Sequence, residues 1–180
     1  PSHDEGAEKL FHYNLMMVST HRDKARVGTI TAGMEHYLEW KDPYPLKLEE
    51  LGDSPSSQEI MIAGLFSKIN FLDVMQNFTI FEPEGGRIIK KIPRYQQFRA
   101  VHKTIERLKT GNTTKEKSGV IWHTQGSGKS LTMVFLTVKM RRDPELRDYK
   151  LVFLTDRTQL DNQLTGTFTN AQNETVHHAD

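Results

Sequence analysis

The chain has 180 residues, a formal net charge of +1, 36% hydrophobic and 26% charged residues, and no cysteine. This composition is typical of a globular protein with one domain or parts of two, and it excludes disulfides, thiolate metal sites and a cysteine nucleophile. No apolar run reaches the roughly 20 residues of a membrane span, and the acidic start PSHDEGAEKL lacks a signal peptide's features, so we expect a cytoplasmic protein.

The first predicted element is a β-hairpin. Residues 10–18 and 26–31 are apolar and β-branched, which predicts two strands joined by the polar turn STHRDKA. Because two strands alone are marginally stable, this hairpin needs a sheet to join. Residues 34–55 contain three prolines and mixed charge, which indicates a surface connection.

A helix is predicted to begin near Ser56, because Ser56 and Glu59 have the spacing of a capping box. Its apolar residues recur at helical spacing and predict a face that packs in the core. These residues are Ile62, Leu65, Phe66, Ile69, Leu72 and Met75. The sequence FEPEGG then interrupts the pattern, which predicts a boundary near residue 85 between an N-terminal and a C-terminal part.

The C-terminal part is predicted to be α/β. A helix with one apolar face follows Pro93 and ends at Gly111. A strand at 118–122, a glycine turn, a helix at 129–142 stopped by Asp143-Pro144, and a strand at 150–156 then form a βαβ unit. This order predicts the start of a parallel sheet.

The sequence HTQGSGKS between the predicted strand and helix resembles a phosphate-binding loop. Such a loop wraps successive backbone N–H groups around phosphate oxygens at a helix N-terminus. Gly126 and Gly128 supply the necessary backbone freedom, Lys129 can reach the β- and γ-phosphates, and the Ser130 hydroxyl can hold Mg²⁺. The candidate nucleotide-binding residues of the loop are His123, Thr124, Gln125, Gly126, Ser127, Gly128, Lys129 and Ser130.

His123 stands where the usual pattern has its first glycine. That position is the turn out of the strand and not a phosphate contact. The loop should therefore keep its function if His123 tolerates the local backbone.

A second candidate nucleotide contact lies upstream, in RYQQFRAV. A planar amide can pair with the N6 donor and the N7 acceptor of adenine at once. Gln97 in the spacing R-Y-x-Q-x-x-A, with Arg94 at its start, is therefore predicted to select ATP. Taken alone, without the neighbouring motif and the loop, Gln97 would be interpreted as a surface helix residue.

These motifs together resemble a known family. RYQQFRAVHKTIERL, GVIWHTQGSGKSLTMVFL and FLTDRTQLDNQL are similar to the Q motif, motif I and motif Ia of superfamily-two helicase-like motors. More narrowly, they resemble the restriction (R) subunit of type I restriction-modification enzymes, in which the variant with histidine first is characteristic. LFHYNLMMVSTHRDKARVGTITA, EHYLEWKDPYP and FLDVMQNFTIFE resemble the same subunit's passage from its nuclease domain into its first motor domain.

The resemblance implies a fold and a division of the chain. Residues 1–55 would be the C-terminal end of a nuclease-like α/β domain, contributing a hairpin and a helix from its edge. Residues 56–84 would be a linking helix, and residues 85–180 the start of a RecA-like ATPase domain with a parallel sheet.

The resemblance also implies roles. Lys129 would be the catalytic lysine of the ATP site, Ser130 the Mg²⁺ ligand and Gln97 the adenine reader, with ATP and Mg²⁺ as cofactors. Thr155, Asp156 and Arg157 fall in the motif Ia region, which contacts the DNA backbone. The family translocates and cuts double-stranded DNA and works with methyltransferase (M) and specificity (S) subunits.

Several groups needed for activity have no candidate in the sequence. An acidic motif that would complete the Mg²⁺ shell and a second lobe with an arginine finger are not found, so we expect little hydrolysis by these 180 residues alone. Glu39-Trp40-Lys41, with Asp23 upstream, imitates a nuclease motif but runs into Asp42-Pro43, a poor strand sequence. The nuclease residues are therefore expected outside this chain, and His177 and His178 are expected to be solvated.

Two other functions remain open on the residues alone. A small P-loop kinase would use the same loop but needs an acceptor site and a lid. A non-hydrolysing DNA-binding or assembly module would instead use residues 87–110, which carry eight bases and only Glu106 as an acid. The alternative for this basic stretch is an ordinary solvated helix face.

Overall fold

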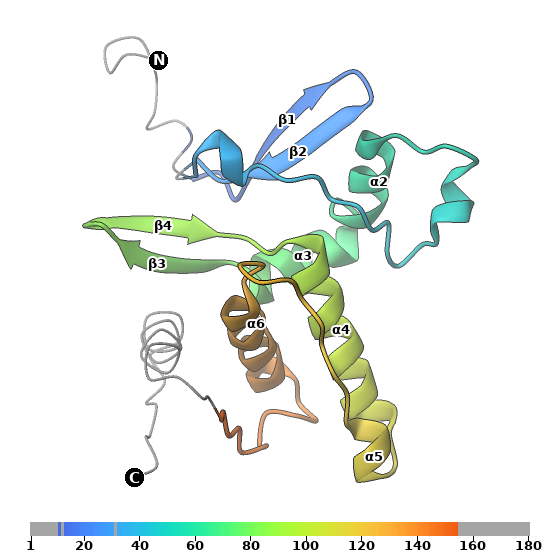
Figure 1. The fold of residues 1–180 in the computed structure, drawn as a ribbon, viewed down its shortest axis with the longest axis vertical. Helices are drawn as coiled ribbons and strands as arrows, with labels where there is room; N and C mark the ends of the chain where they lie inside the picture. The colour runs from blue at the N-terminus through green and yellow to red at the C-terminus, as the bar shows by residue number, and fades with distance from the viewer. Residues whose placement is uncertain (1–10, 12, 31, 155–180) are drawn as a thin grey trace.

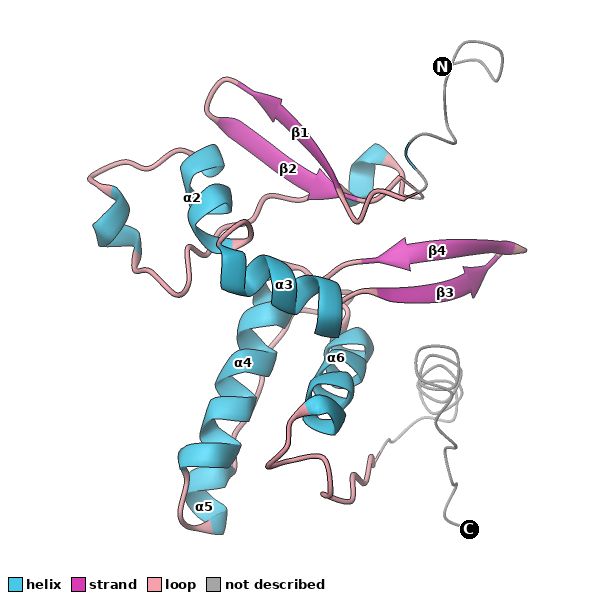
Figure 2. Ribbon diagram, turned by 180° about the vertical axis from the view of Figure 1, so that it is seen from behind, coloured by secondary structure: helices cyan, strands magenta, loops and turns pink. Residues whose placement is uncertain are grey.

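The computed structural model describes residue 11, residues 13–30 and residues 32–154. Two separate antiparallel hairpins and several helices make up these ranges (Figures 1 and 2). The strands are β1 (Met17–His21), β2 (Lys24–Gly28), β3 (Ile80–Glu84) and β4 (Arg87–Lys91). The helices are α2 (Ser57–Gly64), α3 (Lys68–Asn77), α4 (Tyr95–Thr110), α5 (Thr114–Lys117) and α6 (Lys129–Arg142), with 3₁₀ helices η1 (Met34–His36) and η2 (Leu48–Leu51).

The first hairpin forms, but its strand bounds differ from the prediction. β1 pairs with β2 from Met17 opposite Gly28 to His21 opposite Lys24, so that the turn is at Arg22 and Asp23 and not over residues 19–25. Arg22 has the positive φ of 53° that tight hairpin turns require. A tight turn lets residues 19–21 and 24–25 add ladder hydrogen bonds that a longer loop would lose.

A helix, rather than further strands, covers this hairpin. The hydroxyl of Ser57, the first residue of α2, accepts from the N–H of Ala25 at 3.2 Å and donates to its carbonyl at 3.1 Å. Ala25 and Val27 are buried, and Val27 exchanges backbone hydrogen bonds with Leu38. The predicted need for support is therefore met by α2 and by the segment that follows the hairpin.

The helix predicted from Ser56 onward is two helices. Its start is confirmed, since the Ser56 hydroxyl accepts from the N–H of Glu59 and the Glu59 carboxylate accepts from the N–H of Ser56. The break occurs because side chains take the Gly64 carbonyl: the Ser67 hydroxyl donates to it at 3.0 Å and the Asn70 amide at 2.8 Å. Gly64 also lies against the Asp42 carbonyl, where a Cβ would clash at 2.2 Å.

This break makes the predicted core face wrong. Of the six predicted residues, only Leu65 is buried; Ile62 is 63% and Ile69 74% exposed. The break changes the rotation of the second helix about its axis, so that the buried rows are Met61 and Leu65 on α2, then Asn70, Val74 and Phe78 on and after α3. Both rows have the i, i+4 spacing of a buried helix face.

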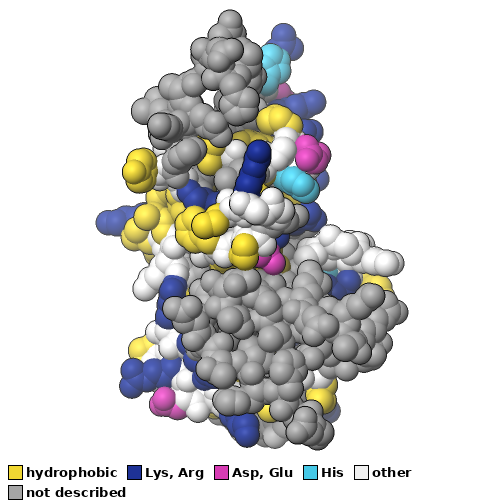
Figure 3. Space-filling model, turned by 90° about the vertical axis from the view of Figure 1, so that its left-hand side faces the viewer, with side chains coloured by type: hydrophobic (Ala, Val, Ile, Leu, Met, Phe, Trp, Pro, Cys, Tyr) yellow, Lys and Arg dark blue, Asp and Glu magenta, His cyan; other side chains and the backbone are white. Residues whose placement is uncertain are grey.

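The FEPEGG sequence forms the second hairpin. β3 and β4 pair from Ile80 opposite Lys91 to Glu84 opposite Arg87. Gly85 and Gly86 make the turn with φ of +59° and +80°, angles that favour glycine at both positions. The hairpin extends away from the helices, toward the left in Figure 1. Figure 3 views the molecule from that side and shows hydrophobic side chains beside Lys and Arg. The predicted domain boundary near residue 85 stays a prediction.

The two long helices of the C-terminal part are confirmed and lie side by side (Figure 1). Their contact is built on Phe78, whose ring centroid lies 4.8 Å from that of Phe98 on α4 and 5.4 Å from that of Phe135 on α6. Trp40 meets Phe98 edge-on at 5.5 Å. One apolar core therefore joins the segment around residue 40 to α3, α4 and α6.

The predicted strands at 118–122 and 150–156 are not formed in the described residues. Both described sheets are two-stranded and antiparallel, and Val120, Trp122 and Leu154 are 91%, 86% and 93% exposed. A strand needs a hydrogen-bonded neighbour, and neither segment has one in the described part. The fold is thus α/β in content, and the parallel sheet remains an expectation.

Candidate nucleotide site

The glycine loop has the backbone that the sequence predicts. Gly126 and Gly128 have φ of +74° and +81°, a left-handed region that glycine enters without strain. Gly128 is the N-cap of α6, so the loop leads directly into a helix N-terminus. The free N–H groups of the first helical turn and the helix dipole favour an anion at such a position.

The carbonyl of Thr124 holds the loop closed. It accepts from the Lys129 ammonium at 2.8 Å and from the Ser127 hydroxyl at 2.6 Å. The Ser127 N–H also points to it, at 3.3 Å. Lys129 is exposed, so its ammonium can exchange this neutral carbonyl for a phosphate oxygen, which is a stronger partner.

Gln97 ties helix α4 to the loop. Its side chain is 2% exposed, its amide donates to the Gly128 carbonyl at 3.0 Å, and its amide oxygen accepts from the Arg94 N–H at 2.8 Å. A Cβ on residue 128 would come within 2.5 Å of the Gln97 amide nitrogen. The structure therefore brings Gln97 and the loop together, as predicted, but through backbone contacts that occupy both ends of the amide.

His123 adopts its position without backbone strain. Among the described residues other than glycine, Arg22 has a positive φ and His123 does not. His123 therefore has an ordinary backbone for an L-residue. A glycine is thus not needed at position 123, in agreement with the sequence argument. Ser130 lies in the first turn of α6 and is partly buried.

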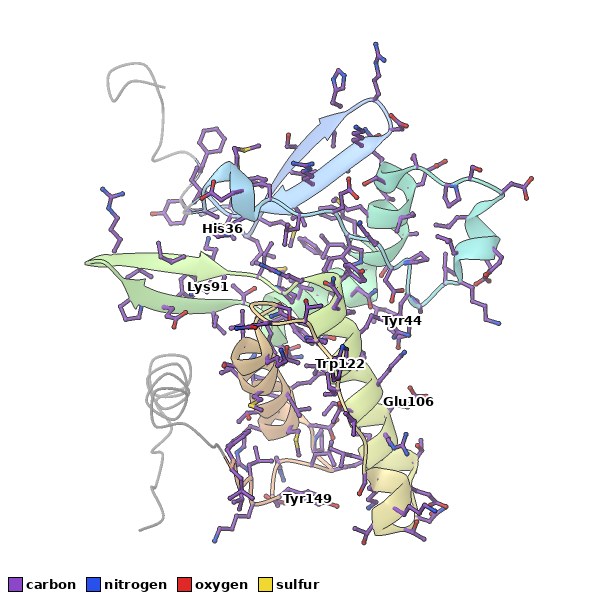
Figure 4. All side chains as sticks on the ribbon, viewed as in Figure 1. His36, Tyr44, Lys91, Glu106, Trp122 and Tyr149 are labelled. Carbon is purple, nitrogen blue, oxygen red and sulfur yellow. The ribbon has the colours of Figure 1, made fainter. Side chains whose placement is uncertain are left out.

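A cavity of about 430 Å³ lies beside the loop. Gly126, Gly128 and Leu131 line one side, and Arg94, Tyr95 and Gln97 line the next. The remaining walls come from β4 with the residues after it and from the segment 27–40. In Figure 4, His36 and Lys91 mark the two elements that approach one another there.

Three of the eight bases in the stretch 87–110 form ion pairs with carboxylates from other parts of the chain. Lys91 pairs with Glu82, Arg99 with Asp42 at 2.9 Å, and Lys109 with Asp143 at 2.7 Å and Glu145 at 3.0 Å. The Arg99 guanidinium also covers the Tyr44 ring, 3.8 Å from its centroid. These contacts give Lys91, Arg99 and Lys109 a structural role, and a nucleic-acid surface on the other bases of the stretch stays a prediction.

A polar network that joins α3, α4 and α6 could not be found in full from the sequence. Asp73 on α3 meets His102 on α4 at 2.7 Å and the Lys139 ammonium on α6, and Asn77 donates to it at 2.6 Å. Burial opposes ionisation of Asp73, but the hydrogen bonds from His102, Asn77 and Lys139 outweigh it and lower its pKa to about 2. Asp73 and Asn77 have the local i, i+4 spacing of a helix, but His102 and Lys139 reach them only through the packing of three helices.

The other predicted site residues either lie outside the described part of the chain or form no nuclease-like cluster within it. Thr155, Asp156 and Arg157, and also His177 and His178, lie outside the described residues. Glu39 pairs with Lys41 at 3.6 Å around the buried Trp40, while Asp23 lies in the turn of the first hairpin. Within the described ranges, no group of three or more metal-binding side chains forms.

Comparison with known proteins identifies sequences related to this chain. The type I restriction enzyme HindI endonuclease subunit of Haemophilus influenzae is 33% identical over 177 residues, which is 94% of this chain and 16% of that protein. This chain is a homologue of a segment of type I restriction endonuclease subunits. The resemblance stated from the motifs is confirmed.

Further relatives agree with this assignment. A proposed type I restriction enzyme MjaIXP endonuclease subunit of Methanocaldococcus jannaschii is 29% identical over 92% of this chain and 17% of its own length. The SauCOLORF180P endonuclease subunit of Staphylococcus aureus is 36% identical over 81 residues, 44% of this chain and 8% of that protein. The SWI2/SNF2 ATPase family model matches residues 96–180. No solved structure matches.

These relatives are much longer than the chain. It spans about one sixth of the length of the Haemophilus protein, at 16%. No helix among the described residues is long and apolar enough to cross a membrane.

Proposed function

We propose that this chain is the ATP-binding start of the motor of a type I restriction endonuclease subunit. The observation that carries the proposal is the loop: two glycines with left-handed backbone precede the N-terminus of α6 and Lys129, and the buried Gln97 fixes the loop from behind. The relatives' names and the match to an ATPase family over residues 96–180 support the same reading.

Each loop residue has a proposed task. The N–H groups of Gln125 to Ser130 surround the phosphates, Lys129 neutralises the β- and γ-phosphates, and the Ser130 hydroxyl holds Mg²⁺. ATP would supply the phosphoanhydride bond, and Mg²⁺ would supply the positive charge that polarises it. Gln97 reads adenine only if it releases Arg94 or Gly128, so base reading would come with a rearrangement of the loop.

The wider activity is also a proposal. ATP turnover would drive movement along double-stranded DNA. Thr155, Asp156 and Arg157 would contact the DNA backbone. The chain would act in a complex with methyltransferase and specificity subunits. DNA cleavage would depend on residues outside this chain. The work would take place in the cytoplasm, where DNA and ATP are both available.

Isothermal titration of the chain with Mg-ATP tests the proposal. Lys129→Ala should weaken ATP binding by at least tenfold, because a charge-assisted contact to phosphate is lost. Lys115→Ala, an exposed lysine on α5, is the matched control and should leave the affinity unchanged. Equal affinity of the Lys129 variant and the wild type would overturn the assignment of the loop.

A further inference from the structure

The cavity beside the loop has one wall that no motif of the ATP site accounts for. Gly33, Glu35, His36 and Glu39, from η1 and the segment after it, line the same cavity as Gly126 and Gly128. These residues are about ninety positions upstream of the loop. The first hairpin and η1 thus help to enclose the candidate nucleotide site, across the domain boundary predicted from the sequence.

The cavity has different chemistry at its two sides. The loop side offers backbone N–H groups and the N-terminus of α6, which suit phosphate oxygens. The η1 side presents two carboxylates, those of Glu35 and Glu39, with side chains 72% and 32% exposed. A carboxylate accepts hydrogen bonds and repels phosphate, so this side suits groups that donate.

Apolar side chains make up much of the remaining lining, together with the cations Lys90, Lys91 and Arg94. Val27, Leu38, Ile89, Ile92 and Leu131 contribute to the lining. An apolar slot with a few polar groups at its ends is the usual form of a small-molecule site. A nucleoside has the matching character, since a flat base would lie against the apolar walls while its donor groups reach the carboxylates.

The backbone of η1 places one of these carboxylates. Glu35 folds back over Gly33, so that a Cβ on residue 33 would lie 2.3 Å from its Oε1. Its carboxylate also meets His36 at 3.6 Å. Glu39 is placed by the next residue, Trp40, which is 2% exposed and anchored against Phe98. Glu39 therefore starts from a segment fixed to the same core as α4, and Glu35 lies four residues before it, on η1.

We propose that Glu35 and Glu39 form the nucleoside side of the ATP pocket and accept hydrogen bonds from the donor groups of the nucleoside. This inference rests on the proposed function, because it requires the phosphates to bind at the loop. The donors on the ligand are the ribose hydroxyls or the exocyclic amine of adenine. The N-terminal hairpin segment would thereby sense whether the motor holds a nucleotide.

The test compares Mg-ATP with Mg-triphosphate, which lacks the nucleoside, by calorimetric titration of the full chain. The double variant Glu35→Ala/Glu39→Ala should bind ATP about tenfold or more weakly, because two charge-assisted hydrogen bonds are lost, and should bind triphosphate no more weakly than the wild type. The control Glu49→Ala/Asp53→Ala removes the same charge at exposed positions outside the cavity and should change neither affinity.

The possible outcomes separate the two proposals. An unchanged ATP affinity in the Glu35/Glu39 variant, or an equal change for ATP and triphosphate, would overturn this inference and leave the loop assignment intact. Insensitivity of triphosphate binding to Lys129→Ala would instead overturn the proposed function. Titration with 2′-deoxyATP, which lacks a ribose hydroxyl, and with inosine triphosphate, which lacks the exocyclic amine, identifies the donor. The loss of affinity caused by Glu35→Ala/Glu39→Ala should disappear for the analogue that lacks the recognised group.

Discussion

The buried amide of Gln97 donates to the carbonyl of Gly128 at 3.0 Å, across 31 positions of sequence. The same carbonyl accepts from the N–H of Thr132 at 3.1 Å as the first hydrogen bond of α6. Helix α4 thus holds the residue at which the loop turns into α6, and the position of the candidate phosphate site depends on the contact between these two helices.

Removal of the Gln97 side chain should loosen this attachment. Gln97→Ala leaves the Arg94 N–H and part of the Gly128 carbonyl without their partner, which should destabilise the chain by about 1–3 kcal/mol and weaken ATP binding severalfold. The neighbouring Gln96 is exposed, so Gln96→Ala is the matched control. Chemical denaturation and ATP titration of both variants measure the difference; equal behaviour of the two would contradict the role given to Gln97.

The two loop glycines should respond differently to alanine. Both have positive φ, so each substitution should cost about 1–2 kcal/mol of backbone strain. At Gly126 a Cβ meets nothing within 4 Å, whereas at Gly128 it meets the Gln97 amide at 2.5 Å. Gly128→Ala should therefore destabilise the chain more than Gly126→Ala when both are unfolded in urea.

A double-mutant cycle isolates the steric part of this difference. Gln97→Ala should remove the clash that Gly128→Ala creates, so the two substitutions together should cost less than their sum. Strict additivity would show that the two side-chain positions do not touch.

Acid should destabilise the chain through Asp73. Its pKa is lowered to about 2 from 3.8 in the folded state, so its contribution is fully present above pH 4 and is lost as the pH falls from about 4 to 2. The shift corresponds to about 2 kcal/mol. Asp73→Asn should reduce stability at pH 7, because Lys139 loses its partner, and should flatten the stability profile over this acidic range.

Urea unfolding at successive pH values measures the Asp73 effect. Asp53→Asn, at an exposed position, is the control and should keep the profile of the wild type. A variant at Asp73 with an unchanged acidic slope would show that another carboxylate dominates there.

The two apolar faces of α3 should differ sharply in their effect on stability. Phe78 is 0% exposed between Phe98 and Phe135, so Phe78→Ala should cost about 3–5 kcal/mol. Ile69 is 74% exposed, and Ile69→Ala should change stability by less than about 0.5 kcal/mol. Thermal unfolding measures the stabilities of the two variants. A large loss of stability in Ile69→Ala would mean that the helix face predicted from the sequence is the buried one.

Local patterns in the sequence predict local structure well in this chain. The capping box at Ser56, the helices α4 and α6, and the loop glycines are each determined by residues within a few positions, and the structure has them. The helix break at Gly64 was missed because the apolar pattern continues through it, whereas the break depends on the Ser67 and Asn70 side chains and on Asp42, which only tertiary packing brings near. The segment 118–122 and the described part of 150–156 form no strand, because neither has a hydrogen-bonded partner among the described residues.

The site shows the same limit. His123, Gly126, Gly128 and Lys129 follow from a motif, and the link to Gln97 follows from the order of two motifs. The motifs do not predict that Arg94 and Gly128 occupy both ends of the Gln97 amide. They also do not predict that Glu35 and Glu39 line the same cavity as the loop, because both features depend on how distant segments pack. The candidate phosphate side of the cavity is therefore predictable from the sequence, and its opposite wall is not.

Nuclear magnetic resonance of the ¹⁵N-labelled chain tests the central claim most directly, because it observes the loop N–H groups themselves. On titration with Mg-ATP, the amide signals of Gln125 to Ser130 should shift and saturate together, and Lys129→Ala should abolish the response. Saturable shifts confined to other segments, or none at all, would contradict the claim that this loop binds the nucleotide.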